Sequence, residues 1–206
     1  MFCNNYEALE KKLTKRGFIV HSVKDAAEAQ ELAFSLIKDG ESVGFGGSFT
    51  VQRQLDLYNQ LDERGHKVYS HWFAADKNQA RADAGAADWY LASTNALLSD
   101  GRLINIDGTG NRVASMLIGP NKVMLFIGKN KYVDGSLDDG IARIKRDACP
   151  PNARRHKFEK LPCGITGQCA NCDNDQRMCR VTTIIEYPTR AIKEFHLVLI
   201  DEELGY

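Results

Sequence analysis

The sequence predicts an α/β protein with a mainly parallel β-sheet. Apolar segments of strand length alternate with segments of helical periodicity from residue 18 to residue 148. When a helix connects one strand to the next, the chain returns to the same end of the sheet and the strands run parallel, with helices on both faces. The 206 residues, 43% of them hydrophobic, are enough for one domain of this kind.

The first half of the chain supplies most of this alternation. Leu9 and Leu13 stand one helical turn apart, and Gly17 is expected to end the first helix. Asp25 and Glu28 have the spacing of a capping box, which predicts the start of a second helix. The pattern predicts strands over 18–23, 42–45, 67–70 and 88–92, and further helices over 25–38, 50–61 and 76–86.

The second half continues the pattern and then changes composition. Ser99-Asp100-Gly101 separates two apolar runs, which predicts a β-hairpin. A helix is expected to stop before Cys149-Pro150-Pro151, because proline interrupts helical hydrogen bonding. The last strand is expected to rejoin the main sheet, so we interpret 1–206 as a single domain and 150–183 as a cysteine-rich insertion within it. The expected elements are a hairpin over 96–106, helices over 111–119 and 136–147, and strands over 122–128, 183–187 and 195–200.

A glycine-rich turn follows the strand at 42–45. In GFGGSFT (44–50), Gly46, Gly47, Ser48 and Thr50 expose backbone and hydroxyl groups where a helix is expected to begin. Such a turn can hold a phosphate or a carboxylate. The alternative is a plain strand-to-helix turn in which Ser48 or Thr50 caps the helix. The turn matches neither the P-loop nor the GxGxxG pattern, and no lysine stands beside it in the sequence.

Three more polar segments follow predicted strands, at 93–95, 107–112 and 128–131. Ligands of parallel sheets bind at the carboxyl ends of the strands, so these segments and the glycine turn are expected to meet in one cleft. Asp107 is a candidate base and Arg112 a candidate partner for a substrate anion. The alternative for 107–112 is a turn whose side chains bond their own backbone. The candidate ligand-binding residues here are Thr94, Asn95, Asp107, Gly108, Gly110, Asn111 and Arg112.

Four cysteines form the most distinctive motif. Cys163, Cys169, Cys172 and Cys179 have the spacing C-x5-C-x2-C-x6-C, while Cys3 and Cys149 stand apart from them. Four thiolates suit a tetrahedral zinc ion or an iron–sulfur cluster, and the spacing does not decide between the two. The alternative is cysteines without a metal, or partly disulfide-bonded. The five histidines are dispersed and form no recognisable catalytic signature.

Composition narrows the classes of partner. Lys plus Arg and Asp plus Glu both number 27, and this zero net charge argues against a nucleic-acid partner, which would require a basic excess. A basic stretch at 143–157 is interpreted as a solvated helix face and loop. It leaves a zinc-bearing nucleic-acid binder as the last-ranked hypothesis. No apolar run approaches the length of a membrane span, and no signal peptide is recognised, so a cytoplasmic protein is expected.

Together these segments resemble the LUD domain family, the lactate-utilisation proteins. The resemblance rests on VGFGGSFT (43–50), NIDGTGNRVAS (105–115), GPNKVMLFIGKNKYV (119–133), IARIKRDACPPNARR (141–155) and CGITGQCANCDNDQRMC (163–179). These motifs follow one another from about residue 5 to Gly205. The chain is similar to single-domain members that carry a C-terminal four-cysteine cluster.

The resemblance implies a Rossmann-like sheet related to ribose-5-phosphate isomerase, glucosamine-6-phosphate deaminase and the CoA transferases. It implies that residues 46–50 form an anion-binding loop and that the polar residues of 94–112 line the rest of the site. No residue matches the glutamate nucleophile of CoA transferases clearly, so the catalytic residue is left open.

The resemblance also implies a function. The chain is expected to bind a small anionic metabolite and to take part in oxidation of lactate or a related hydroxy acid. The partner would be an oxidoreductase subunit that holds iron–sulfur clusters. The alternative is a non-catalytic metal or iron–sulfur module with a redox or regulatory role. Whether the chain is an enzyme by itself is left open.

Overall fold

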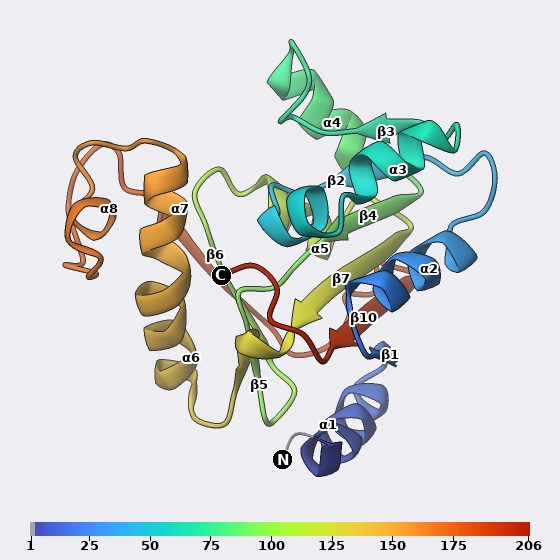
Figure 1. Cartoon of the computed structure of the whole chain (residues 1–206), viewed down its shortest axis with the longest axis horizontal. Helices are drawn as coiled ribbons and strands as arrows, with labels where there is room; N and C mark the ends of the chain where they lie inside the picture. The colour runs from blue at the N-terminus through green and yellow to red at the C-terminus, as the bar shows by residue number, and fades with distance from the viewer. Residues whose placement is uncertain (1–2) are drawn as a thin grey trace.

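The computed structural model describes residues 3–206 and contains two β-sheets (Figure 1). The larger sheet has six strands in the order β1-β10-β7-β4-β2-β3, and every pairing in it is parallel. The α/β class and the mainly parallel sheet predicted from the sequence are therefore confirmed. The six strands are β1 (Ile19–Val23), β2 (Val43–Phe45), β3 (Val68–Tyr69), β4 (Trp89–Ala92), β7 (Lys122–Gly128) and β10 (Glu194–Ile200).

The last strand lies in the middle of this sheet. On one side β10 pairs with β1, from Ile19 opposite His196 to Val23 opposite Ile200. On its other side β10 pairs with β7. Six of the seven residues of both β7 and β10 are buried, whereas β1 at the edge is half exposed. The prediction that the last strand rejoins the main sheet is confirmed.

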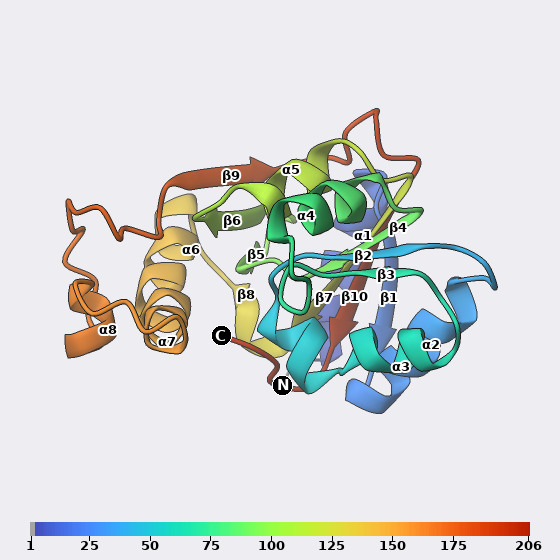
Figure 2. The same ribbon diagram turned by 90° about the horizontal axis from the view of Figure 1, so that it is seen from above.

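Helices cover both faces of the larger sheet, as the alternating pattern predicts (Figure 2). On one face Leu9 and Leu13 of α1 join Met116 of α5 in a core with Leu125 and Leu197. The other face carries a second core that includes Phe45, Trp89 and Phe126. The first core packs beneath α1 (Cys3–Lys15), α4 (Lys77–Ala86) and α5 (Asn111–Leu117), and the second beneath α2 (Ala26–Leu36) and α3 (Leu57–Glu63).

The predicted hairpin belongs to a second, four-stranded sheet with the order β8-β5-β6-β9. Gly101 has the left-handed φ of 92° that the hairpin turn requires. The strand expected at 183–187 begins and ends two residues earlier and pairs antiparallel with β6. These strands are β5 (Ala96–Leu98), β6 (Leu103–Asp107), β8 (Tyr132–Val133) and β9 (Val181–Ile185).

The single helix expected over 50–61 is wrong. The chain forms a π-helical segment, η1 (Thr50–Gln54), and then α3 begins at Leu57. Asp56 separates the two with a left-handed φ of 45°. One core contains side chains from both segments: Val51, Leu55, Leu57 and Leu61. A regular helix could not direct all four into it, so their packing favours the break.

The helix stop predicted before Cys149 is also wrong. α6 (Leu137–Arg143) continues through a π-helical segment, η3 (Ile144–Ala148), into α7 (Cys149–Arg155). Pro150 and Pro151 occupy the first turn of α7, where their missing N–H groups are tolerated. The wide π turn in front of them replaces the break, so one long bent helix reaches from residue 137 to residue 155.

Beyond α7 lies the cysteine-rich segment, at the outer end of the molecule (Figures 1 and 2). It contains one short helix, α8 (Pro162–Thr166), and then has neither helix nor strand until β9. Its own core holds only Ala153, Leu161 and Cys163 as buried members. Within residues 3–206 no helix combines the length and apolar character required to cross a bilayer.

Close packing of α4 on β2 leads to a first prediction. A Cβ on Gly44 would overlap the backbone carbonyl of Ala84 in α4, which cannot move as a flexible side chain does. We expect Gly44→Ala to lower the free energy of unfolding by about 2–3 kcal/mol in urea denaturation. Gly85→Ala is the control, because its Cβ would meet only the Ser115 hydroxyl at 3.3 Å. Equal stability of the two variants would contradict this packing.

Candidate functional site

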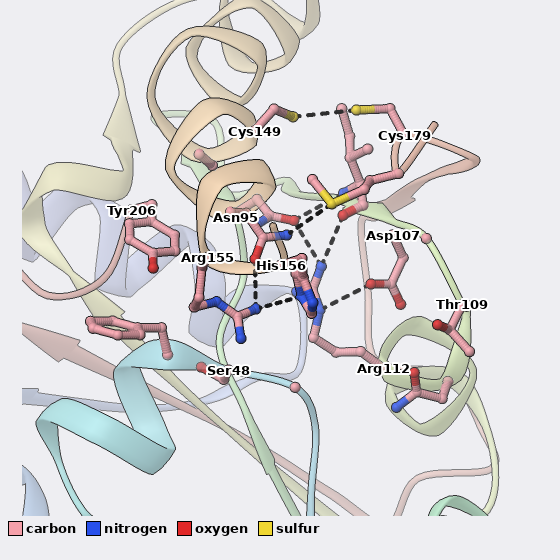
Figure 3. Close-up of a pocket in the computed structure, with 18 of the residues that line it drawn as sticks. Ser48, Asn95, Asp107, Thr109, Arg112, Cys149, Arg155, His156, Cys179 and Tyr206 are labelled. Atoms are coloured by element: carbon pink, nitrogen blue, oxygen red, sulfur yellow. Dashed lines mark hydrogen bonds and ion pairs between the residues drawn. The ribbon is translucent and has the colours of Figure 1, made fainter. Parts of the chain in front are cut away.

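A cleft of about 960 Å³ opens where the carboxyl ends of β2, β4 and β7 face β6 and α7 (Figure 3). Its size is that of small-molecule sites in proteins. The polar segments that follow β2, β4 and β7 meet here, as the position of loops in a parallel sheet predicts, and the segment at the end of β6 joins them from the second sheet. Ser93, Asn95, Asp107 and Lys131, from three different loops, all line the cleft.

Most of the sequence-predicted site residues come together in this cleft. Gly46 and Gly110 do not line it. Gly46 lies behind the wall, where a Cβ would meet Ala92, Arg112 and Tyr90, and Gly110 adopts a left-handed φ of 88° at the start of α5. Ligand binding by any of the sequence-predicted site residues stays a prediction. The nine that line the cleft are Gly47, Ser48, Thr50, Thr94, Asn95, Asp107, Gly108, Asn111 and Arg112.

The hydroxyl groups of the glycine turn already have hydrogen-bond partners within the protein. The Ser48 hydroxyl accepts a hydrogen bond from the Val51 N–H at 3.3 Å, which is the capping alternative. Thr50 points to a lysine instead, and the Lys131 Nζ lies 3.0 Å from its hydroxyl oxygen. Although no lysine stands beside this turn in the sequence, the loop after β7 supplies one.

Lys131 is a buried amine at the floor of the cleft, and only 3% of the residue is exposed. Its Nζ donates hydrogen bonds to the hydroxyls of Thr50, at 3.0 Å, and Ser93, at 2.6 Å. Burial, with the nearby charges of Arg143 and Arg112, lowers the pKa of Lys131 from 10.5 to about 7. The lysine therefore exchanges its proton near neutral pH, which suits a group that binds an anion or moves a proton.

Arg112 joins the loops of the cleft rather than offering its side chain to a ligand. Its Nη1 donates to the Ser93 carbonyl, at 2.6 Å, and to the Asn105 amide oxygen, at 2.7 Å. Its Nη2 donates to Asn95 and Ile106, and its Nε lies 3.5 Å from the Asp107 carboxylate. All five N–H groups thus face protein oxygens. The expected pairing of Arg112 with a substrate anion would require one of these bonds to open.

The cleft carries a strong surplus of positive charge. Two carboxylates line it, those of Asp107 and Asp175, against eight cationic side chains. His71 also lines it, and burial followed by the charges of Arg81 and Lys77 lowers its pKa to about 4, so the imidazole is neutral at pH 7. The cationic residues are Arg53, Lys77, Arg81, Arg112, Lys131, Arg155, Arg177 and Arg180.

Some of these groups are far apart in the sequence and were not predicted as site residues. Arg155 and His156, at the end of α7, hydrogen-bond each other at 2.8 Å and line the cleft (Figure 3). The stacked rings of Tyr206 and Phe49 lie close by, with centroids 5.1 Å apart. The basic stretch at 143–157 contained Arg155 and His156, but only the continuation of the helix past the prolines carries them to the cleft.

The cysteines gather beside the cleft. Cys149 and Cys179 both line it, and their Sγ atoms lie 3.3 Å apart (Figure 3). This hydrogen bond lowers the pKa of the Cys179 thiol and raises that of Cys149, since one proton serves both sulfurs. Cys163, Cys169 and Cys172 lie around a second, smaller cavity, which Cys149 and Cys179 also border.

The arrangement of these thiols leaves the predicted metal site untested. Within the described residues, no three side chains of histidine, cysteine, aspartate or glutamate are already placed to hold one metal ion. The five cysteines numbered 149, 163, 169, 172 and 179 are free thiols. Metal binding by the predicted set therefore stays a prediction.

Comparison with known proteins agrees with the fold. A crystal structure of a DUF162 family protein from Deinococcus radiodurans is similar to this chain, with a TM-score of 0.57 and 12% sequence identity, over 96% of this chain and 97% of that one. At this identity the likeness concerns the fold alone. No curated protein gives a significant match. The LUD domain matches residues 6–200, nearly the whole chain. The chain therefore belongs to the LUD domain family and is a protein of the lactate-utilisation type.

Proposed function

We propose that the basic cleft binds a small anionic metabolite, and that the protein takes part in oxidation of lactate or a related hydroxy acid. The proposal rests on the charge of the cleft, which is lined by eight cationic side chains and by only two carboxylates. In such an enclosed site cations attract a carboxylate or phosphate more strongly than they do in water. Membership of the LUD domain family favours a hydroxy acid among the anions.

Oxidation of a hydroxy acid also requires an electron acceptor. Conversion of a 2-hydroxy acid to a 2-oxo acid removes two electrons and two protons. Lys131, with its pKa of about 7, is partly neutral at pH 7, and in that form it can accept one proton in the cleft, while the second proton passes to water. The electrons need an acceptor, and an oxidoreductase subunit that holds iron–sulfur clusters would supply it. We therefore propose that the chain works as one subunit of a complex.

Removing one charge from the cleft should weaken binding. We expect Arg155→Gln to weaken the binding of lactate, pyruvate or phosphate by about tenfold, the loss of one charge-assisted hydrogen bond. Isothermal titration at low salt measures the affinity. Arg154→Gln is the matched control. Arg154 is the preceding residue, and its side chain is exposed and does not line the cleft.

A second variant closes the cleft without changing its charge. A Cβ on Gly47 would already lie 3.3 Å from His71 and 3.4 Å from Trp72, so the larger side chain of Gly47→Leu must occupy the cleft. We expect this variant to bind none of the tested anions while keeping its secondary structure by circular dichroism. If no carboxylate or phosphate binds the wild-type chain, or if both variants bind as the wild type does, the proposal is wrong.

A further inference from the structure

Five thiols border a second, smaller cavity, which shares the wall formed by Cys149 and Cys179 with the basic cleft. Cys149 stands at the start of α7, Cys163 lies in α8, and Cys169, Cys172 and Cys179 come from the segment that leads to β9. The cavity measures about 20 Å³. A space of this size holds a single ion or water molecule, whereas a cube of four irons and four sulfides needs far more room.

The spacing of two sulfurs supports a single ion. The Sγ atoms of Cys149 and Cys179 lie 3.3 Å apart. In a tetrahedral zinc site with Zn–S bonds of about 2.3 Å, two thiolates are separated by about 3.8 Å. Small side-chain rotations give that distance here. The four thiolates of a four-iron cube bind different irons with sulfides between them, so they must stand much farther apart; two thiolates on one iron of a two-iron cluster would have the spacing found on zinc, and the metal analysis below separates these two cases.

Two further cysteines pack beside this pair. Cys163 is buried in the small core of the segment, and Cys172 is half-buried against the same core. Cys169 borders the cavity but is exposed. Cys149 and Cys179 pack instead in the neighbouring core beneath α6, so each core presents two thiols to the cavity.

The segment that carries these thiols is held together by few apolar contacts. Its core has three buried members, and residues 168–180 contain neither helix nor strand. Arg177 bends this stretch around the cavity by donating to the carbonyls of Cys172, at 2.5 Å, and Cys179, at 2.9 Å. Small units with so little core commonly use a metal or disulfides for stability.

Two cationic side chains border the cavity. Lys145 and Arg177 are among its lining residues. A zinc ion with four thiolates carries a net charge of two minus, and two cations at the wall balance it.

We infer that the cysteine segment holds one structural Zn²⁺ through Cys149, Cys163, Cys172 and Cys179. Cys149 replaces Cys169 of the set expected from the sequence spacing. Metal binding draws Cys163 and Cys172 toward the Cys149–Cys179 pair, since no three ligands are preformed in the described residues. The site does not depend on the proposed oxidation, because it concerns the stability of a wall of the cleft and not the ligand in it.

Metal analysis of the full chain, purified under reducing and anaerobic conditions, tests the inference. We expect one zinc per chain, with four sulfurs at about 2.3 Å by X-ray absorption and the visible bands of a tetrahedral thiolate site after Co²⁺ substitution. Iron with acid-labile sulfide and a brown colour would overturn it. So would a chain that contains no metal after this purification.

Matched variants identify the ligands. Cys149→Ser should weaken zinc binding by at least ~100-fold and leave three sulfurs on the metal, whereas Cys169→Ser should keep all four. Cys172→Ser is a second ligand variant at a half-buried position, for use if Cys149→Ser fails to fold. Four sulfurs in both ligand variants, or loss of a sulfur in Cys169→Ser, would overturn the assignment.

Discussion

Lys131→Met is expected to weaken anion binding strongly and at the same time to stabilise the protein. The buried lysine is the central cation of the cleft, so its neutral replacement should weaken the affinity for lactate or phosphate by at least about 100-fold, a loss of about 3 kcal/mol for a charged hydrogen bond. Moving its pKa from 10.5 to about 7 corresponds to a cost of about 5 kcal/mol in the folded state. Loss of the bonds to Thr50 and Ser93 offsets about 2 kcal/mol of this, which leaves a net gain of about 3 kcal/mol.

The direction of the pH dependence follows from the lowered pKa. Between about pH 7 and pH 10.5 the unfolded chain holds a proton on Lys131 that the folded chain has released, so this residue makes stability rise with pH. The advantage of Lys131→Met should therefore be greatest at and below pH 7 and vanish near pH 10.5. Anion binding by the wild type should weaken as pH rises above 7, because the amine loses its charge.

Urea denaturation at several pH values and titration calorimetry measure these effects. Lys129→Met is the control, because Lys129 lies two residues away and pairs with Asp201 at the surface. Equal stability of Lys131→Met and the wild type at pH 6, together with unchanged anion binding, would contradict the role given to this lysine.

Arg112→Met is expected to be the most destabilising substitution at the cleft. The guanidinium is buried and is the hydrogen-bond donor for oxygens of Ser93, Asn95, Asn105 and Ile106. Asn105 is itself fully buried, and its amide nitrogen already has no partner among the described residues. Leaving these acceptors without donors should cost about 3–5 kcal/mol and lower the melting temperature by about 10 °C.

Lysine cannot substitute for this arginine. A single ammonium cannot reach acceptors on three sides, so Arg112→Lys should recover less than half of the lost stability. Arg146→Gln, at an exposed position of η3, should leave the melting temperature unchanged. Differential scanning calorimetry compares the three variants. A melting temperature of Arg112→Met within 2 °C of the wild type, against the ~10 °C drop expected for so buried a group, would show that Arg112 does not join the loops.

Much of the fold could be predicted because each strand has its own local signal. The buried runs at 88–92 and 122–128 have strand length, and Asp25 caps α2 as its spacing with Glu28 predicts, by accepting from the Glu28 N–H. The errors lie at helix irregularities. Neither the break at Asp56 nor the passage of α7 through two prolines has a local signal, since core packing and a π turn select them.

The site was predictable where loops follow strands and unpredictable where side chains compete for partners. The rule for parallel sheets brought Thr50 and Asn95 to one cleft, and Asp107 joins them from the end of β6 in the second sheet. It could not show that the N–H groups of Arg112 donate to oxygens of the protein, or that Cys149 lies beside Cys179. Such contacts depend on three-dimensional geometry between segments that are distant in the sequence.

The position of β10 constrains how the chain can fold. Among the strands of residues 3–206, β1 pairs only with β10, and their paired residues are separated by about 177 positions. On the ribosome β1 must therefore wait until residues 194–200 have emerged, and the sheet closes only when β10 enters between β1 and β7. Because contacts so distant in sequence form slowly, we expect refolding over milliseconds to seconds, with an intermediate in which β1 still exchanges its amide hydrogens.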